Sequence, residues 1–141
     1  MSLDIPSGLR RVVIAKTGNR CEYCLLPQEA ALHKHEPDHI IPIQHGGVTI
    51  ESNLALACMR CNRYKGPNVG SIDPVTKKLF PFFNPRINTW VEHFKLAEEL
   101  IEPLTAEGRV TVNILRLNDG TRVQERRILL SVGYTLLTEI I

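Results

Sequence analysis

Two Cys-x-x-Cys pairs constrain the fold of this chain more than any other sequence feature. They occupy residues 21–24 and 58–61 and contain all four cysteines of the chain. A Cys-x-x-Cys turn presents both thiols on one side, so two turns supply the four ligands of a tetrahedral zinc site. Four unrelated thiols would be the alternative, but no cysteine lies outside the pairs. We predict that one structural zinc ion is bound by Cys21, Cys24, Cys58 and Cys61.

The spacing of the pairs indicates an inserted element. Residues 25–57 separate them, a longer gap than the ~15–20 residues of simple zinc ribbons. A site closed by four thiolates has no open coordination position, so this zinc is structural and not catalytic. An ordinary zinc hydrolase is therefore a poor fit, since the sequence offers no second set of three ligands.

Composition and charge indicate a globular protein with local basic clusters. Hydrophobic residues make up 43% of the chain and charged residues 23%. A length of 141 residues fits a single domain over 1–141. The net charge of +2 does not by itself indicate a polyanion partner. Basic residues gather at 10–20 and 60–65, where they suit phosphate contacts, although solvated surface is the commoner role.

The sequence favours a cytoplasmic location. No apolar run approaches the ~18 residues that a membrane helix needs. The first residues lack the basic start and apolar stretch of a signal peptide. In the cytoplasm thiols stay reduced, and paired cysteines there favour a metal over disulfides.

Local patterns around the cysteine pairs predict short elements. Ser7 is the expected cap of a first helix that reaches Lys16 and ends at Gly18-Asn19. We expect strands near 31–36 and at 54–57, a loop over 42–52, and a short helix over 58–65. Gly66-Pro67 is a helix stop.

The rest of the chain has a weaker pattern. Residues 67–90 are rich in Pro, Gly and Asn and predict an irregular connection. Residues 93–100 are ambiguous between strand and helix. Apolar residues at helical spacing predict helices over 106–117 and 121–138, with their apolar stripes in the core and not on a partner surface.

Polar residues between and just after the cysteine pairs have the chemistry of a phosphodiesterase. Hydrolysis of a phosphodiester needs a base to activate water and a cation to stabilise phosphate charge. His39 can supply a neutral imidazole, while Asp38 and Asn62 carry oxygens that suit Mg²⁺ or Mn²⁺. A single histidine is more often structural than catalytic, and an Asn such as Asn53 most often caps a turn. Spacing alone does not show that these residues meet.

Four motifs follow one another between and after the cysteine pairs: Asp38-His39-Ile40-Ile41-Pro42, Gly46-Gly47, and the runs 53–58 and 61–66. Their order resembles the HNH endonucleases with flanking zinc-binding cysteines. The resemblance is specific across residues 21–66. Residues 83–86, Trp90, His93-Phe94 and 105–118 resemble the C-terminal part of small stand-alone bacterial HNH proteins.

The resemblance implies an α+β fold with a ββα-metal core, also called a His-Me finger. This core would span about 21–66, with the four-cysteine zinc site beside it and additional N- and C-terminal helices. A helical or mixed extension would occupy about 67–141.

The resemblance also implies roles for single residues. His39 would be the general base, and Asn53 would hold the loop and orient His39. Asp38 and Asn62 would bind the catalytic divalent cation. Asn62 stands where the motif has its final histidine, which favours Mg²⁺ or Mn²⁺ and leaves Ni²⁺ or Zn²⁺ possible.

The function implied is metal-dependent hydrolysis of DNA phosphodiester bonds. DNA would be held mainly through its backbone, with phosphate contacts from Arg63, Lys65 and His45. The alternative is a catalytically silent, zinc-stapled module that binds nucleic acid or a protein.

Overall fold

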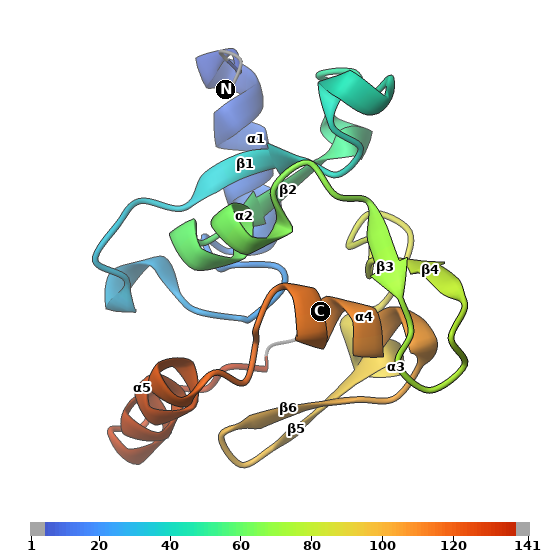
Figure 1. Cartoon of the computed structure of the whole chain (residues 1–141). Coiled ribbons are helices and arrows are strands. Elements are labelled where there is room, and N and C mark those ends of the chain that lie inside the picture. The colour runs from blue at the N-terminus through green and yellow to red at the C-terminus, as the bar shows by residue number, and fades with distance from the viewer. Residues whose placement is uncertain (1–4, 138–141) are drawn as a thin grey trace.

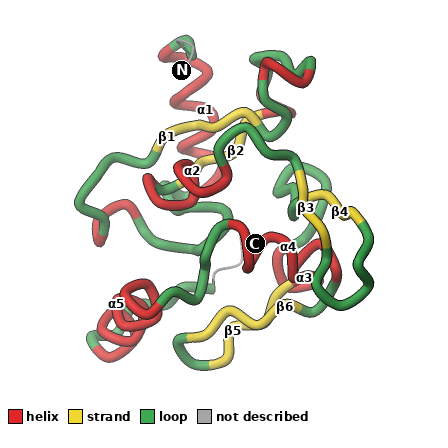
Figure 2. Tube along the Cα trace, viewed as in Figure 1, coloured by secondary structure: helices red, strands yellow, loops and turns green. Residues whose placement is uncertain are grey.

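The computed structural model describes residues 5–137 and contains short helices and strands joined by long loops (Figures 1 and 2). The helices are α1 (Ser7–Thr17), α2 (Met59–Lys65), α3 (Trp90–His93), α4 (Ala106–Ile114) and α5 (Gly120–Ser131). The strands are β1 (Glu36–His39), β2 (Leu54–Ala57), β3 (Gly70–Ile72), β4 (Leu79–Pro81), β5 (Phe94–Ala97) and β6 (Leu100–Pro103). They pair as three antiparallel ribbons, β1–β2, β3–β4 and β5–β6. No helix within residues 5–137 is long and apolar enough to cross a membrane.

Strand β2 lies at the centre of the finger and is buried on both faces. Its alternate residues belong to different cores: Leu54 and Leu56 pack with Val13 of α1, whereas Ala55 and Ala57 pack with the cysteines. Successive strand residues point to opposite faces, so α1 and the four-cysteine cluster cover opposite sides of β2. Helix α2 follows β2 directly and packs against both β1 and β2 (Figure 1). The predicted ββα arrangement within an α+β fold is confirmed.

Several predicted elements are present with small changes. Helix α1 ends at Gly18, which adopts the left-handed conformation with φ of 65°. Its N-cap is Pro6, so Ser7 is the first helical residue and not the cap. The strand at 54–57 and the helix that ends before Gly66 are confirmed.

The position of the first strand was predicted wrongly. It spans Glu36–His39 and not residues 31–36. Its sequence, Glu-Pro-Asp-His, has no apolar alternation, and local propensity does not favour a strand there. The strand forms because it pairs with buried β2, in a register that sets Asp38 opposite Ala55 and His39 opposite Leu54.

The C-terminal half also differs from the prediction. Residues 67–90 contain the β3–β4 ribbon, and residues 93–100 belong to the β5–β6 hairpin. Helix α4 is confirmed and packs against β3, β4 and β6. Helix α5 ends at Ser131, short of the predicted 138, and Thr138 lies outside the described residues. The short strands were not predicted because three or four residues are too few to show a clear alternation of apolar and polar residues.

An ion pair joins the β3–β4 ribbon to α4. Arg109 Nε and Nη2 donate to the two carboxylate oxygens of Asp73 at 2.7 and 2.9 Å. The Asp73 side chain is completely buried and also accepts from the amides of Val75 and Thr76. Its hydrogen bonds with Arg109 hold the pKa of Asp73 well below its usual range.

This ion pair predicts acid-sensitive stability. A carboxylate with a depressed folded-state pKa stabilises the fold above its unfolded pKa of about 4, and this stabilisation is lost as the pH falls below that value. We expect Asp73→Asn to lower the melting temperature at pH 7. The difference from wild type should shrink on acidification. Thermal unfolding at pH 7 and pH 3 measures both, and a pH-independent difference would contradict the assignment.

Candidate functional site: a four-thiol cluster beside an Asp-His finger

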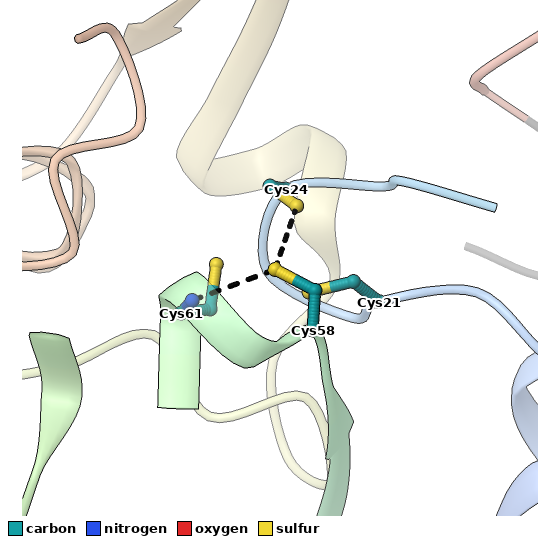
Figure 3. Close-up of side chains that lie close together, drawn as sticks. All are labelled: Cys21, Cys24, Cys58 and Cys61. Atoms are coloured by element: carbon teal, nitrogen blue, oxygen red, sulfur yellow. Dashed lines mark hydrogen bonds between the residues drawn. The ribbon is translucent and has the colours of Figure 1, made fainter. Parts of the chain in front are cut away.

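The four cysteines converge on one buried point. Their sulfur atoms all lie within 4.8 Å of one another, and Figure 3 shows the two turns facing each other. The Sγ atoms of Cys24 and Cys58 are 3.6 Å apart. With Zn–S bonds near 2.3 Å, the sulfur atoms of a tetrahedral zinc site lie about 3.8 Å apart. The geometry fits a four-coordinate ion, and the four cysteines could hold a structural metal such as zinc.

The four thiols are buried, and the pKa values of Cys21, Cys24 and Cys61 are shifted in different directions. Hydrogen bonds with Cys21, Cys58 and Cys61 hold the pKa of Cys24 well below its usual value. None of the four cysteines is more than 4% exposed, and none forms a disulfide. Burial raises the pKa of the Cys21 and Cys61 thiols well above the usual value. A metal ion must therefore displace protons when it binds, because its ligands are thiolates.

The first cysteine turn is supported by the segment that precedes α3. Trp90 Nε1 donates to the Tyr23 carbonyl at 3.0 Å, and Arg86 forms an ion pair with Glu22. The other carboxylate oxygen of Glu22 accepts from the amide of Leu56 at 2.8 Å. These contacts give Arg86 and Trp90 a structural role next to the cluster.

A buried ion pair connects β1 to α2. Lys65 Nζ lies 2.9 Å from Asp38 Oδ2 and donates to the His39 carbonyl at 3.0 Å. The Lys65 side chain is only 2% exposed. Burial raises the pKa of Asp38, and the Lys65 ammonium opposes that shift. Lys65 was predicted to contact phosphate, but in this structure its ammonium is engaged inside the finger.

His39 contacts a residue that the sequence analysis did not identify. Its Nε2 lies 2.8 Å from Thr49 Oγ1, on the loop that connects β1 to β2. No hydrogen bond within residues 5–137 engages Nδ1 of His39. Thr49 had no recognisable signal in the sequence because it lies in an irregular loop ten residues from the histidine.

Asn53 holds the same loop closed. Its Oδ1 accepts from the Ile41 amide at 2.9 Å, and its Nδ2 donates to the carbonyls of Ile41 and Val48 at 3.0 and 2.9 Å. Gly47 permits this closure, because an added Cβ would lie 1.7 Å from the Ile41 oxygen. Asn53 therefore fixes the loop that carries Thr49. It makes no hydrogen bond to His39 among the described residues.

Comparison with known proteins identifies this part of the chain. Residues 21–68 match the family model described as HNH endonuclease. This segment is similar to the HNH endonucleases. The resemblance seen in the sequence is thus confirmed. Residues 21–68, the HNH segment, contain both cysteine pairs and Asp38-His39.

A longer similarity links the HNH segment and the residues after it to one curated protein. The chain is 24% identical over 124 residues to the Septu protein PtuB of Bacillus thuringiensis. The alignment covers 86% of this chain and 46% of the relative, so the chain spans about half the length of that protein. No solved structure matches the chain significantly.

The remaining predicted residues lie on the surface of the HNH segment or near it. Asn62 is half-buried on α2, three residues before Lys65, and positions three apart share one helix face. It therefore lies on the side of α2 that meets Asp38. Arg63 and His45 are exposed, on α2 and on the β1–β2 loop. Their phosphate contacts stay a prediction.

The hydrogen bonds of Asn53 predict a large loss of stability on substitution. Asn53→Ala leaves one partly buried amide and two carbonyls without partners, which should cost about 2–4 kcal/mol. Asn62→Ala is the matched control and should change stability by less than about 0.5 kcal/mol. Denaturant unfolding measures both variants. Equal losses would show that the loop does not depend on Asn53.

Proposed function

We propose that the HNH segment is a metal-dependent endonuclease that hydrolyses DNA phosphodiester bonds. The observation that supports this most strongly is the position of Asp38-His39 at the end of β1, where Lys65 of α2 contacts both residues. The match of residues 21–68 to HNH endonucleases adds the reaction class. Catalysis would take place in the cytoplasm, where the thiols stay reduced.

His39 is the general base in this proposal. The Thr49 hydroxyl engages Nε2 and fixes the ring. With that nitrogen as the donor, the lone pair is on Nδ1, where it can accept a proton from water.

Asp38 and Asn62 would bind the catalytic cation. A carboxylate and an amide are oxygen ligands, which favour Mg²⁺ or Mn²⁺. The cation supplies positive charge to the phosphate in the transition state. Lys65 already neutralises Asp38, and it holds the carboxylate and the His39 carbonyl in fixed positions.

DNA would be bound through its phosphates. Arg63 and His45 are exposed near the finger, and such contacts weaken as salt increases. No base-reading residue is assigned, so we propose backbone binding that is largely independent of sequence.

A plasmid assay tests the proposal. Supercoiled DNA is incubated with the zinc-loaded chain and either Mg²⁺ or Mn²⁺, and the nicked and linear forms are quantified on a gel. We expect cleavage with at least one of these ions and none without them. Plasmid that is bound but left intact with both ions would support the catalytically silent alternative instead.

The contact between Thr49 and His39 predicts a positioning effect. Thr49→Val removes the hydroxyl and keeps the shape, and it should lower kcat about tenfold with little change in KM, as expected for a partner that orients a reactive imidazole. Thr49→Ser keeps the hydroxyl and should retain most activity. If valine and serine variants cleave plasmid equally fast, Thr49 does not orient His39.

A further inference from the structure

Helix α5 is attached to the protein by two buried arginines. Its buried residues are Arg122, Arg126 and Leu129, spaced so that they share one face. Apolar Ile128 and Val132 are instead 57% and 67% exposed, so only part of the predicted apolar stripe, such as Leu129, is in the core. A guanidinium that is removed from water requires strong polar partners to offset its desolvation.

The partners of Arg122 include the metal-binding sulfurs. Its Nη2 lies 3.0 Å from Cys61 Sγ and 3.7 Å from Cys58 Sγ, and its Nη1 donates to the Leu115 carbonyl at 2.7 Å. Arg122 is 3% exposed, and no carboxylate within residues 5–137 forms an ion pair with it. The negative charge nearest to this guanidinium is therefore that of the thiolates.

The contact between Arg122 and the cysteine sulfur atoms balances part of the charge of the zinc site. Four thiolates around one divalent zinc leave a net charge of −2 in a buried site. One guanidinium offsets half of that charge, and hydrogen bonds to charged groups are stronger than those between neutral groups. The Cys61 amide also lies 3.4 Å from Cys58 Sγ, so the second cysteine turn receives both backbone and side-chain donors.

We propose that Arg122 is a positioning residue of the zinc site and couples zinc binding to the docking of α5. The guanidinium stabilises the thiolates of Cys58 and Cys61, and the bound zinc in turn holds the arginine that anchors the helix. This coupling does not depend on the proposed DNA cleavage. It would make α5 part of the metal site, although α5 lies some 60 residues after the second cysteine pair.

Arg126 provides a matched control on the same helix face. It is 4% exposed and donates to the carbonyls of Glu99 and Leu117 at 2.7 and 2.6 Å. It also contacts Asn118 Oδ1 at 3.0 Å. None of these partners is a sulfur atom. Arg126→Gln removes these contacts and none of those to the sulfur atoms, so it separates the loss of a buried guanidinium from the loss of the thiolate contact.

Zinc affinity separates the two arginines. The zinc-loaded chain of residues 1–141 is equilibrated with a chromophoric chelator at fixed pH, as wild type, Arg122→Gln and Arg126→Gln. We expect Arg122→Gln to weaken zinc binding by about 10- to 100-fold, the range seen when outer partners of metal ligands are lost. Arg126→Gln should stay within about twofold of wild type. Unchanged affinity in Arg122→Gln, or equal losses in both variants, would overturn the proposal.

A measurement on the wild-type chain covers the case in which Arg122→Gln does not fold. The chain is loaded with the spin-half isotope of cadmium in place of zinc, and NMR is used to detect scalar coupling between the metal and protons bonded to nitrogen. We expect coupling from an Arg122 Nη proton through Cys61 Sγ, in addition to coupling from backbone amides. Amide couplings without an Arg122 coupling would overturn the proposed contact.

Discussion

Replacement of His39 by alanine should abolish plasmid cleavage and leave the fold intact. A positioned general base contributes about 10²- to 10⁴-fold to the rate, and the alanine variant has no group to accept the proton from water. The structural cost is small. The side chain of His39 makes one hydrogen bond, to Thr49, which is worth about 1 kcal/mol.

The measurement compares initial cleavage rates with Mg²⁺ or Mn²⁺, together with thermal unfolding of the same preparations. His33→Ala is the matched control, because His33 is exposed and lies before β1, and no role is assigned to it. The control should cleave at the wild-type rate. If His39→Ala cut as fast as wild type, another residue would have to be the base.

Removal of zinc should unfold the chain. All four cysteines belong to the larger buried core, together with Phe83, Trp90 and Phe94. Structural zinc sites contribute about 10–16 kcal/mol in small domains, which is comparable to the whole stability of a typical protein, about 5–15 kcal/mol. Without the ion, no coordinate bonds join the two cysteine turns, and four thiols remain in the core.

Circular dichroism and thermal unfolding before and after chelation measure this effect, with the zinc content determined in parallel. Cys24→Ser and Cys61→Ser remove one ligand from each turn and should both lose the cooperative transition. A chain that is free of zinc and still melts at the wild-type temperature would show that the cluster does not hold the fold together.

The finger could be predicted from the sequence because its residues have unusual chemistry at fixed spacing. The cysteine pairs, the strand of β2 and the helix before Gly66 all have local signals, and the structure contains them. Strand β1 has no such signal, since its Glu-Pro-Asp-His sequence becomes a strand only by pairing with β2. Its position was therefore predicted wrongly.

The helix α5 shows a second limit of sequence reasoning. Periodicity assigned its apolar residues to the core, but the buried face carries Arg122 and Arg126. An arginine is usually exposed, and only the position of its partners in space reveals that it is buried. The contact of Thr49 with His39 and the ion pair of Lys65 with Asp38 were not predicted for the same reason. Both contacts join segments that are distant in the sequence.

Two metal sites with separate roles are proposed for this chain, one for a structural zinc and one for an exchangeable cation that takes part in the chemistry. The most direct test measures zinc content, melting temperature and plasmid cleavage on one preparation, dialysed against a weak chelator and then supplied with Mg²⁺ or Mn²⁺. We predict that the dialysed chain keeps its zinc and its melting temperature but does not cleave plasmid. Addition of Mg²⁺ or Mn²⁺ should restore cleavage while the zinc content stays unchanged. Cleavage that varied with the zinc content and did not depend on Mg²⁺ or Mn²⁺ would contradict the separation of the two metal sites.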